Sequence, residues 1–384
     1  MKRWLSGSLI IATVFVIVIL AACTPKAAPA TPTQAPTAPT TPASPTSNVS
    51  PPTSQDAAWD KVVEAAKKEG KINFYNWYFT EGRGGRVLEQ AFEAKYGIEL
   101  SAIQGRGAEF TERLKTEKRI GQMVADVVEG SSLHMENMRL AELLKPTIDM
   151  PVMKEKDVWH MVPNYHNKDA FYLNYQRMFL TMFMNTNLVK PGEEPKGLMD
   201  LLDPKWKGKL IISDPVVSEI ASRFVLYTSQ KRVPDDFPTR LGRQQLIFDP
   251  STPGAALKLA QGNASIAILL ATLDVSNLVA EGAPIRVLDI KEGTMVDALS
   301  MGAVNNGPHP NATKVFLNYI LSPEGQKLMA DKSLSYPVRK GITANVPPAM
   351  QLEPSNPLLI DPAAVEFVAK AFREKQMVSA LKPN

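Results

Sequence analysis

Residues 71–103, KINFYNWYFTEGRGGRVLEQAFEAKYGIELSAI, alternate between two kinds of apolar spacing. Residues 72–79 form an apolar and aromatic run that predicts a strand, and residues 87–92 place apolar side chains at helical spacing. A glycine-rich loop at 82–85 separates the two, and a second apolar strand follows at 98–103. Strand, loop, helix and strand in this order predict an α/β fold, in which helices cover a parallel sheet.

The same unit continues along the chain. We expect a loop at 104–107 and a helix at 110–120, then a strand at 124–128, a loop at 130–132 and a helix at 133–144. Parallel strands end at the same edge of a sheet, and ligands of open α/β sheets bind at that edge. The three loops should therefore open into one crevice.

A second α/β set is expected further along. Its strands are expected at 210–213, 246–248, 265–270 and 285–288, and its helices at 216–229, 254–261 and 275–281. Strands at 170–175 and 178–184, divided at Gln176-Arg177, and a strand at 297–304 should connect the two sets. Helices are also expected over 312–320, after the cap Ser322-Pro323-Glu324, and over 362–380.

The first 22 residues predict an export signal. Lys2 and Arg3 precede an apolar run of fourteen residues, 9–22, which is shorter than the about 20 residues that span a membrane as a helix. The run ends in Leu20-Ala21-Ala22-Cys23, which resembles the lipobox of bacterial lipoproteins. We expect removal of 1–22 and lipidation of Cys23; an uncleaved anchor around a buried thiol is the alternative. Both place the rest outside the cytoplasm, attached to the cell membrane at the cell surface or in the periplasm.

Residues 23–53 predict a disordered tether. From residue 24 on, the segment has nine prolines, eight threonines and one charge, so it cannot bury enough apolar surface to offset the entropy of ordering. Cys23 is the only cysteine, so the chain has no internal disulfide and the fold must rest on its hydrophobic core.

Composition excludes several classes of protein. The 384 residues are 44% apolar and 21% charged, as in soluble globular proteins, and a chain of this length suggests two to three folding units. Without Lys2, Arg3 and Lys26 the chain carries 40 basic and 39 acidic side chains, so we expect no nucleic-acid partner. The sequence has no G-x-S-x-G, H-E-x-x-H, P-loop or C-x-x-C motif, which disfavours an enzyme.

The candidate ligand-binding residues lie at or after the carboxyl ends of predicted strands: Trp77 and Tyr78 are at the end of the strand 72–79, and the others come after a strand. In the first set they are Trp77, Tyr78, Arg83, Arg106, Ser131 and Ser132, and in the second set Asp214, Ser251 and Thr272. The aromatic rings could cover an apolar or cationic surface, and the arginines suggest an anionic group. Each also has a structural alternative: a core ring, a tight turn at 82–85, a helix cap at the serines, or a solvated loop residue.

A histidine-containing segment allows a metal site as an alternative. His160 and His166, with Asp157 and Asp169 nearby, could act as ligands, but their spacing fits no helical zinc pattern and a packed polar cluster is the preferred interpretation. His134 near the first crevice is interpreted as a surface or capping residue. We predict no metal site and no cofactor.

Several strings of the chain resemble one family. They include Met184-Asn185-Thr186-Asn187-Leu188-Val189, Asp203-Pro204-Lys205-Trp206-Lys207-Gly208-Lys209-Leu210, Ser213-Asp214-Pro215, Ser322-Pro323-Glu324-Gly325-Gln326 and Tyr336-Pro337-Val338-Arg339. In this order they are similar to bacterial extracellular solute-binding proteins of family 1, and more narrowly to the substrate-binding lipoproteins of iron(III)-type ABC importers. The resemblance spans residues 60–340.

The resemblance implies a two-lobe periplasmic-binding-protein fold of type II. Each lobe would be a mixed sheet flanked by helices, with crossover strands near 171–184 and 297–304 joining the lobes and the solute held in a cleft between them. We expect lobe 1 to comprise 54–168 and 290–384, and lobe 2 to comprise 169–289. The lobes would close about the crossover strands when solute binds.

The iron-binding members of the family use adjacent tyrosines that this chain lacks. The corresponding segment reads Ile268-Leu269-Leu270-Ala271-Thr272-Leu273-Asp274. Bare ferric ion needs anionic oxygen ligands, so an organic acid, a phosphonate or an iron(III) chelate is preferred over ferric iron. We therefore expect a monomeric, non-enzymatic binding protein that delivers a small solute to an ABC permease and its ATPase. The alternatives are an exported lipid-anchored enzyme on the same scaffold and a solute-sensor ectodomain.

Overall fold

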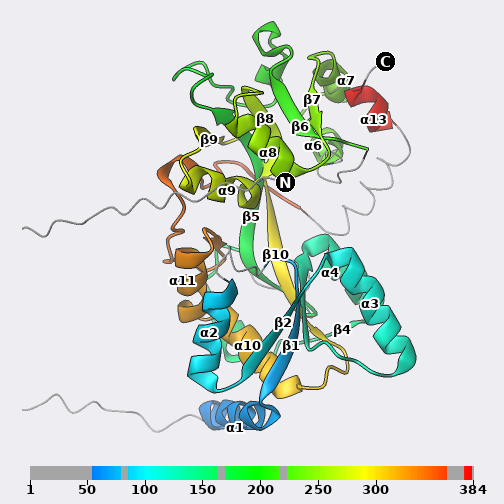
Figure 1. Cartoon of the computed structure of the whole chain (residues 1–384), viewed down its shortest axis with the longest axis vertical. Coiled ribbons are helices and arrows are strands. Elements are labelled where there is room, and N and C mark those ends of the chain that lie inside the picture. Colours follow the sequence, from blue (N-terminus) through cyan, green and yellow to red (C-terminus); the bar gives the residue numbers. More distant parts are fainter. Residues whose placement is uncertain (1–53, 79–84, 162–168, 217–222, 361–375, 383–384) are drawn as a thin grey trace, which may run out of the picture. The chain divides into compact units, whose positions relative to one another are not determined.

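A computed structural model describes residues 54–78, 85–161, 169–216, 223–360 and 376–382 (Figure 1). Its strands join into one twelve-stranded sheet in which the central order is β2-β1-β3-β10-β5-β8-β6-β7. The predictions about the leader, Cys23 and the tether lie outside the described residues.

The first group of strands is parallel, as the sequence predicts. The group consists of β1 (Lys71–Asn76), β2 (Glu99–Gln104) and β3 (Val127–Ser131), covered by α2 (Gly85–Tyr96), α3 (Gly107–Ile120) and α4 (Ser132–Leu140). The strand predicted at 124–128 is present with its bounds shifted to 127–131, and the loop predicted at 130–132 is wrong. β3 continues through Gly130 to Ser131, and α4 begins at the next residue because extended Ser131 serves directly as its N-cap.

Helices from distant parts of the sequence complete this half. They are α1 (Ser54–Glu69), α10 (Pro310–Leu321) and α11 (Pro323–Lys332), and α1 packs against α10. The rings of Phe74, Phe92 and Phe316 pack together between the sheet and these helices. The predicted cap is confirmed: the Ser322 Oγ accepts a hydrogen bond of 3.1 Å from the Gly325 amide. The remaining short elements here are β4 (Leu144–Lys145) and η2 (Pro151–Lys154).

The second group also has a parallel core. β6 (Leu210–Ser213) pairs in parallel with β7 (Ile247–Asp249) and β8 (Ile266–Ala271). The other elements are α6 (Phe224–Ser229), α7 (Phe237–Gly242), α8 (Thr252–Ala260), α9 (Thr272–Ala280), β9 (Ile285–Leu288), η3 (Met199–Leu202) and η4 (Pro204–Trp206). Of the helix expected at 216–229, Val216 lies in a turn, 217–222 fall outside the described residues and 224–229 are helical. The one-turn helix α7 was not predicted.

Two long antiparallel strands connect the groups. β5 (Leu173–Asn185) and β10 (Thr294–Val304) lie side by side, and every residue of both is buried (Figure 1). The predicted division at Gln176-Arg177 is wrong. Gln176 lies opposite both Leu299 and Pro337, so partners on both sides satisfy the backbone at a point where the polar side chains suggested a turn.

A third segment, residues 336–359, passes from the first group toward the second. β11 (Tyr336–Pro337) pairs with β5, η5 (Pro348–Met350) contacts α9 and β9, and β12 (Pro357–Leu359) pairs with β10 at residues 294–296. The segment is fixed at its far end, where the Asp289 carboxylate accepts bonds from the Ser355 amide and hydroxyl. This connection is additional to the two crossover strands that the sequence predicts.

The last described helix, α13 (Gln376–Leu381), packs against α7 of the second group. Residues 361–375, which hold most of the helix expected at 362–380, lie outside the described residues. Among the helices that the structure describes, none combines the length and the apolar character needed to cross a membrane.

Candidate binding edges of the sheet

The carboxyl edge of β1–β3, which we call edge 1, is organised by a buried carboxylate. Glu129 lies in β3 with no exposed surface, and its Oε2 accepts hydrogen bonds from the amides of Trp77 (2.9 Å) and Tyr78 (2.8 Å). Its Oε1 accepts a bond of 2.5 Å from the Tyr175 hydroxyl of β5. Glu129 thus fixes the start of the loop after β1 and leaves the Trp77 side chain 46% exposed, while Tyr78 is buried.

Two further loops meet at edge 1. The Gly105 amide donates to the Asn76 carbonyl across 3.1 Å, which ties the end of β2 to the end of β1. A Cβ at Gly107 would lie 2.6 Å from the His134 ring, so only glycine permits this approach of α3 to α4. Arg106 therefore lies near the start of α4, and its exposed guanidinium has no hydrogen-bond partner among the described residues.

Ser131 and His134 form a pair at the beginning of α4. The Ser131 Oγ and the His134 Nδ1 are 2.8 Å apart, the distance expected of a nucleophile and its base. The sequence does not predict this pair. The two residues are the N-cap and third residue of one helix, so helix geometry alone brings them together.

The corresponding edge of β6–β8, edge 2, carries several carboxylates. The Asp214 amide donates to the Asp249 carbonyl (2.6 Å), the Asp249 Oδ1 accepts from the Ser251 amide (2.9 Å), and the Asp274 Oδ2 accepts from the Thr252 hydroxyl (2.6 Å). Lys382, just after α13, reaches the Asp214 carboxylate at 2.7 Å, and Lys258 reaches Asp249 at 2.9 Å. The Asp214, Lys258 and Lys382 side chains are partly exposed and Asp249 is buried. Several separate contacts therefore hold this edge together.

Ser251 and Thr272 have defined structural contacts at edge 2. The Ser251 Oγ caps α8 by accepting from the Gly254 amide at 3.0 Å. The Thr272 side chain is fully buried, and its hydroxyl accepts a bond of 3.2 Å from the Phe179 amide of β5. A solute contact by the Thr272 hydroxyl would have to compete with this bond.

One buried network links both groups through a crossover strand. The Asp297 carboxylate of β10 accepts a bond of 2.5 Å from the Ser132 hydroxyl at the start of α4, and one of 3.1 Å from the Arg223 Nη1 at the start of α6. Asp297 and Arg223 are 1% and 7% exposed. The Nε and Nη2 of Arg223 have no hydrogen-bond partner among the described residues, so part of a desolvated guanidinium stays available.

Each edge also ends in a buried polar atom that lacks a hydrogen-bond partner in the described part of the chain. These atoms are the Asn76 Oδ1 at the end of β1 and the Ser213 Oγ at the end of β6. Buried polar atoms normally have partners, so both mark places where another group can bond.

The structure thus brings the sequence-predicted residues to two edges. Trp77, Tyr78, Arg106, Ser131 and Ser132 belong to edge 1, and Asp214, Ser251 and Thr272 belong to edge 2. Arg83 lies outside the described residues. Sequence reasoning missed Glu129, Arg223 and Asp297; the signal for the two carboxylates is a lone acidic residue inside an apolar strand, and Arg223 offered none.

Metal ligands are not gathered at either edge in the described part of the chain, where no three His, Cys, Asp or Glu side chains could hold an ion together. His160 donates its amide to Val338 at 2.7 Å, and His166 lies outside the described residues. All described tyrosines except Tyr96 are buried, and burial raises the pKa of Tyr75, Tyr227 and Tyr336.

Comparison with known proteins identifies the family. A family model described as bacterial extracellular solute-binding protein matches residues 135–360. The chain belongs to this family. It is therefore a solute-binding protein of the ABC-importer type, in agreement with the resemblance that its sequence strings carry.

Relatives of this solute-binding protein extend over most of its length. Iron uptake protein A1 of Synechocystis sp. is 25% identical over 300 residues, which are 74% of this chain and 80% of that protein. A Trichodesmium protein solved in complex with iron and citrate has a TM-score of 0.65 at 21% identity, covering 80% of this chain and 99% of its own. AfuA from Actinobacillus pleuropneumoniae, with fructose-6-phosphate bound, has a TM-score of 0.62 at 21% identity, covering 82% and 99%.

These structures confirm the predicted fold class, the type II periplasmic-binding-protein fold. The family is named for extracellular solute binding and AfuA as a periplasmic binding protein, and none of the three relatives is named as an enzyme.

Proposed function

We propose that this solute-binding protein captures a small anionic solute between edge 1 and edge 2 and delivers it to an ABC permease and its ATPase. The observation that carries the proposal is the partly unpartnered Arg223 guanidinium beside Asp297. A buried guanidinium can hold a carboxylate or phosphate through two parallel hydrogen bonds, and desolvation strengthens such bonds. Ser132, on the other side of Asp297, connects this position to edge 1.

The solute class follows from the charges and from the tyrosines. Citrate and fructose-6-phosphate, the ligands of two structural neighbours, are both anions. A bare ferric ion would need anionic oxygen ligands, and burial disfavours the ionised form of Tyr75, Tyr227 and Tyr336. No three His, Cys, Asp or Glu side chains of the described residues are placed to hold an ion instead. In an iron(III) chelate the chelator supplies those ligands, so we propose an organic acid, a phosphorylated solute or an iron(III) chelate.

We further propose two lobes that close about β5 and β10. The boundaries follow the sequence prediction of 54–168 with 290–384, and 169–289, with one change: the packing of α13 on α7 favours placing 376–382 with the second lobe. Closure would bring Trp77, Arg106 and the Arg223 guanidinium around the solute. The Ser131–His134 pair is assigned to solute binding and to the start of α4, and no catalytic step is proposed.

The affinity of an Arg223→Gln variant tests the anion. We expect isothermal titration with iron(III) citrate, citrate and fructose 6-phosphate to find a bound solute, and the variant to weaken its binding tenfold or more, because a charge-assisted hydrogen bond contributes about 1.5–3 kcal/mol. Arg243→Gln, an exposed arginine of the same half, is the matched control. Equal affinities of the wild type and the Arg223 variant would refute the role of this guanidinium.

The membrane anchor is tested separately. We propose that Cys23 is lipidated and that residues 24–53 tether the binding unit to the membrane. A Cys23→Ser variant should then be released from the membrane fraction, while solute affinity stays unchanged. Continued retention of the variant in that fraction would contradict the lipid anchor.

A further inference from the structure

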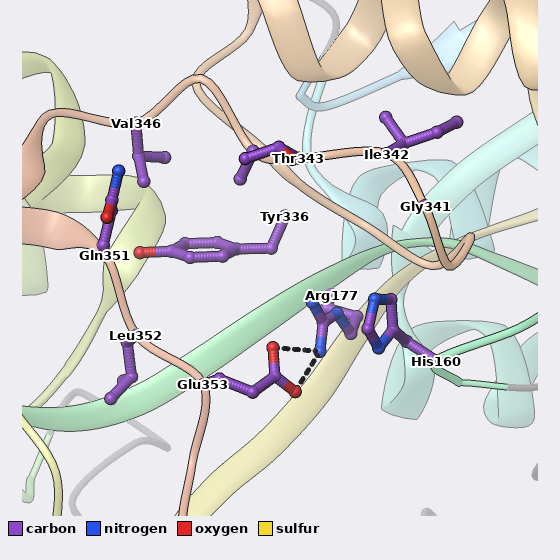
Figure 2. Close-up of a pocket in the computed structure, with 11 residues that line it drawn as sticks. His160, Arg177, Tyr336, Gly341, Ile342, Thr343, Val346, Gln351, Leu352 and Glu353 are labelled. Carbon is purple, nitrogen blue, oxygen red and sulfur yellow. Dashed lines mark hydrogen bonds and ion pairs between the residues drawn. The ribbon is translucent and has the colours of Figure 1, made fainter.

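A pocket of about 420 Å³ lies between β5 and the third segment, and no residue of either edge lines it (Figure 2). Arg177 of β5 and Tyr336 of β11 line it, together with His160 and with residues 341–344, 346 and 351–353 of the third segment. The volume is within the range of small-molecule sites, about 300–1,000 Å³.

Arg177 is the central polar group of this pocket. Its side chain is 9% exposed, and its Nε donates to the Pro337 carbonyl at 2.9 Å, which fixes the orientation of the guanidinium. Its Nη1 donates to both oxygens of Glu353, at 2.9 and 3.2 Å. Its Nη2 has no hydrogen-bond partner among the described residues. The guanidinium is therefore fixed in place by its Nε and Nη1, and its Nη2 can donate to a further acceptor.

Glu353 is a poor permanent partner for this arginine. Its side chain is 66% exposed and belongs to the irregular stretch between η5 and β12. An exposed carboxylate gains little from such a pair and is well solvated when released. Figure 2 shows the Glu353 carboxylate directed at the Arg177 guanidinium among the side chains that line the pocket.

The remaining lining selects the body of a ligand. Ile342, Val346 and Leu352 supply apolar surface, and Val346 is buried. The His160 ring lies beside Arg177 (Figure 2). Burial and the positive charge of Arg177 lower the pKa of His160. At neutral pH the His160 ring therefore adds a neutral polar group and no second charge.

We propose that this pocket is a second binding site, for a small carboxylate with a short aliphatic body. The ligand carboxylate replaces Glu353 on Arg177 and also uses the Nη2, while the aliphatic part lies against the apolar side chains. The site is independent of the solute proposed to bind between the edges.

Butanoate is the probe, and butanamide, of the same shape without the charge, is the matched ligand. Both are titrated by saturation-transfer NMR into the wild type, Glu353→Gln, Arg177→Gln and Glu99→Gln, the last removing an exposed carboxylate far from the pocket. We expect Glu353→Gln to bind butanoate about tenfold more tightly than the wild type, because it lacks the internal competitor. Arg177→Gln should lose the binding, and Glu99→Gln should match the wild type.

Equal butanoate affinities of Glu353→Gln and Glu99→Gln would overturn the proposal, as would equal binding of butanamide. If Arg177→Gln fails to fold, the comparison of the two glutamate variants still decides. Butanoate held by Arg223 would not respond to Glu353→Gln, so failure of this inference is distinguishable from failure of the proposed function.

Discussion

Edge 1 and edge 2 have the same topology but are held together differently. In each, parallel strands end in loops that begin helices. Edge 1 depends on one fully buried carboxylate, Glu129, which bonds two loop amides and a hydroxyl of β5. Edge 2 depends on two ion pairs whose lysines are partly exposed, Asp214–Lys382 and Asp249–Lys258, together with the buried Thr272 contact.

The two edges should differ in how much stability they lose when a single residue is substituted. Removing a buried carboxylate that has several donors takes the acceptor from all of them at once, and donors that stay buried cannot replace it with water. Screened surface pairs can be lost one at a time at small cost. We therefore expect single substitutions to disrupt edge 1 and only to weaken edge 2.

Glu129→Ala should have the largest effect. It takes the acceptor from the part-buried Trp77 amide and from two buried donors, the Tyr78 amide and the Tyr175 hydroxyl. Each buried unsatisfied donor costs about 1–3 kcal/mol, so the free energy of unfolding should fall by about 2–6 kcal/mol. Urea unfolding measures this loss. Glu112→Ala, an exposed glutamate of α3, is the control and should change stability by less than about 0.5 kcal/mol. A similar small loss in both variants would remove the distinction between the edges.

Thr272→Val should have an intermediate effect. The substitution keeps the side-chain shape but removes the acceptor of the buried Phe179 amide, so we expect a loss of about 1–3 kcal/mol in the free energy of unfolding. Hydrogen exchange of that amide should also become faster. Thr116→Val, on the exposed face of α3, is the control. An unchanged exchange rate would mean that the hydroxyl does not hold β5.

Lys382→Gln should have the smallest effect. Burial raises the pKa of Asp214, but bonds from Lys382 and the Val216 amide outweigh it, so the pKa lies below its usual value. The ionised form is thus favoured in the folded state, and its contribution is present at neutral pH and lost as the pH falls below about 4. At pH 7 the variant should lose about 0.5 kcal/mol, because the pair is partly exposed. The loss should shrink in acid, and a loss that grows there would contradict the assignment.

The sequence predicts the elements that have local causes. Ser322, which is followed by proline and glutamate, caps α11. In residues 71–103 the spacing of the apolar residues changes from that of a strand to that of a helix and back, and the structure has a strand, a helix and a strand there. The sequence does not predict features that depend on distant pairing. β5 passes through Gln176 and Arg177 without a turn because β10 and β11 lie on either side, more than a hundred residues away in the chain.

The residues of the two edges also divide into those that local sequence patterns predict and those that depend on distant contacts. Strand-to-helix connections placed Arg106, Ser131 and Asp214 at the edges, since the carboxyl ends of parallel strands are known once the strands are known. The pairing of Arg223 with Asp297 joins residues 74 positions apart, and no local pattern encodes that distance.

The third segment has a mechanical consequence for the proposed closure. Two adjacent strands, such as β5 and β10, form a ribbon that can bend and can also undergo torsion about its long axis. A further connector, paired with β5 at Tyr336 and bonded to Asp289 through Ser355, resists torsion because the two anchor points would have to slide past each other. Bending then remains the softest degree of freedom, so one half would approach the other along a single repeatable path.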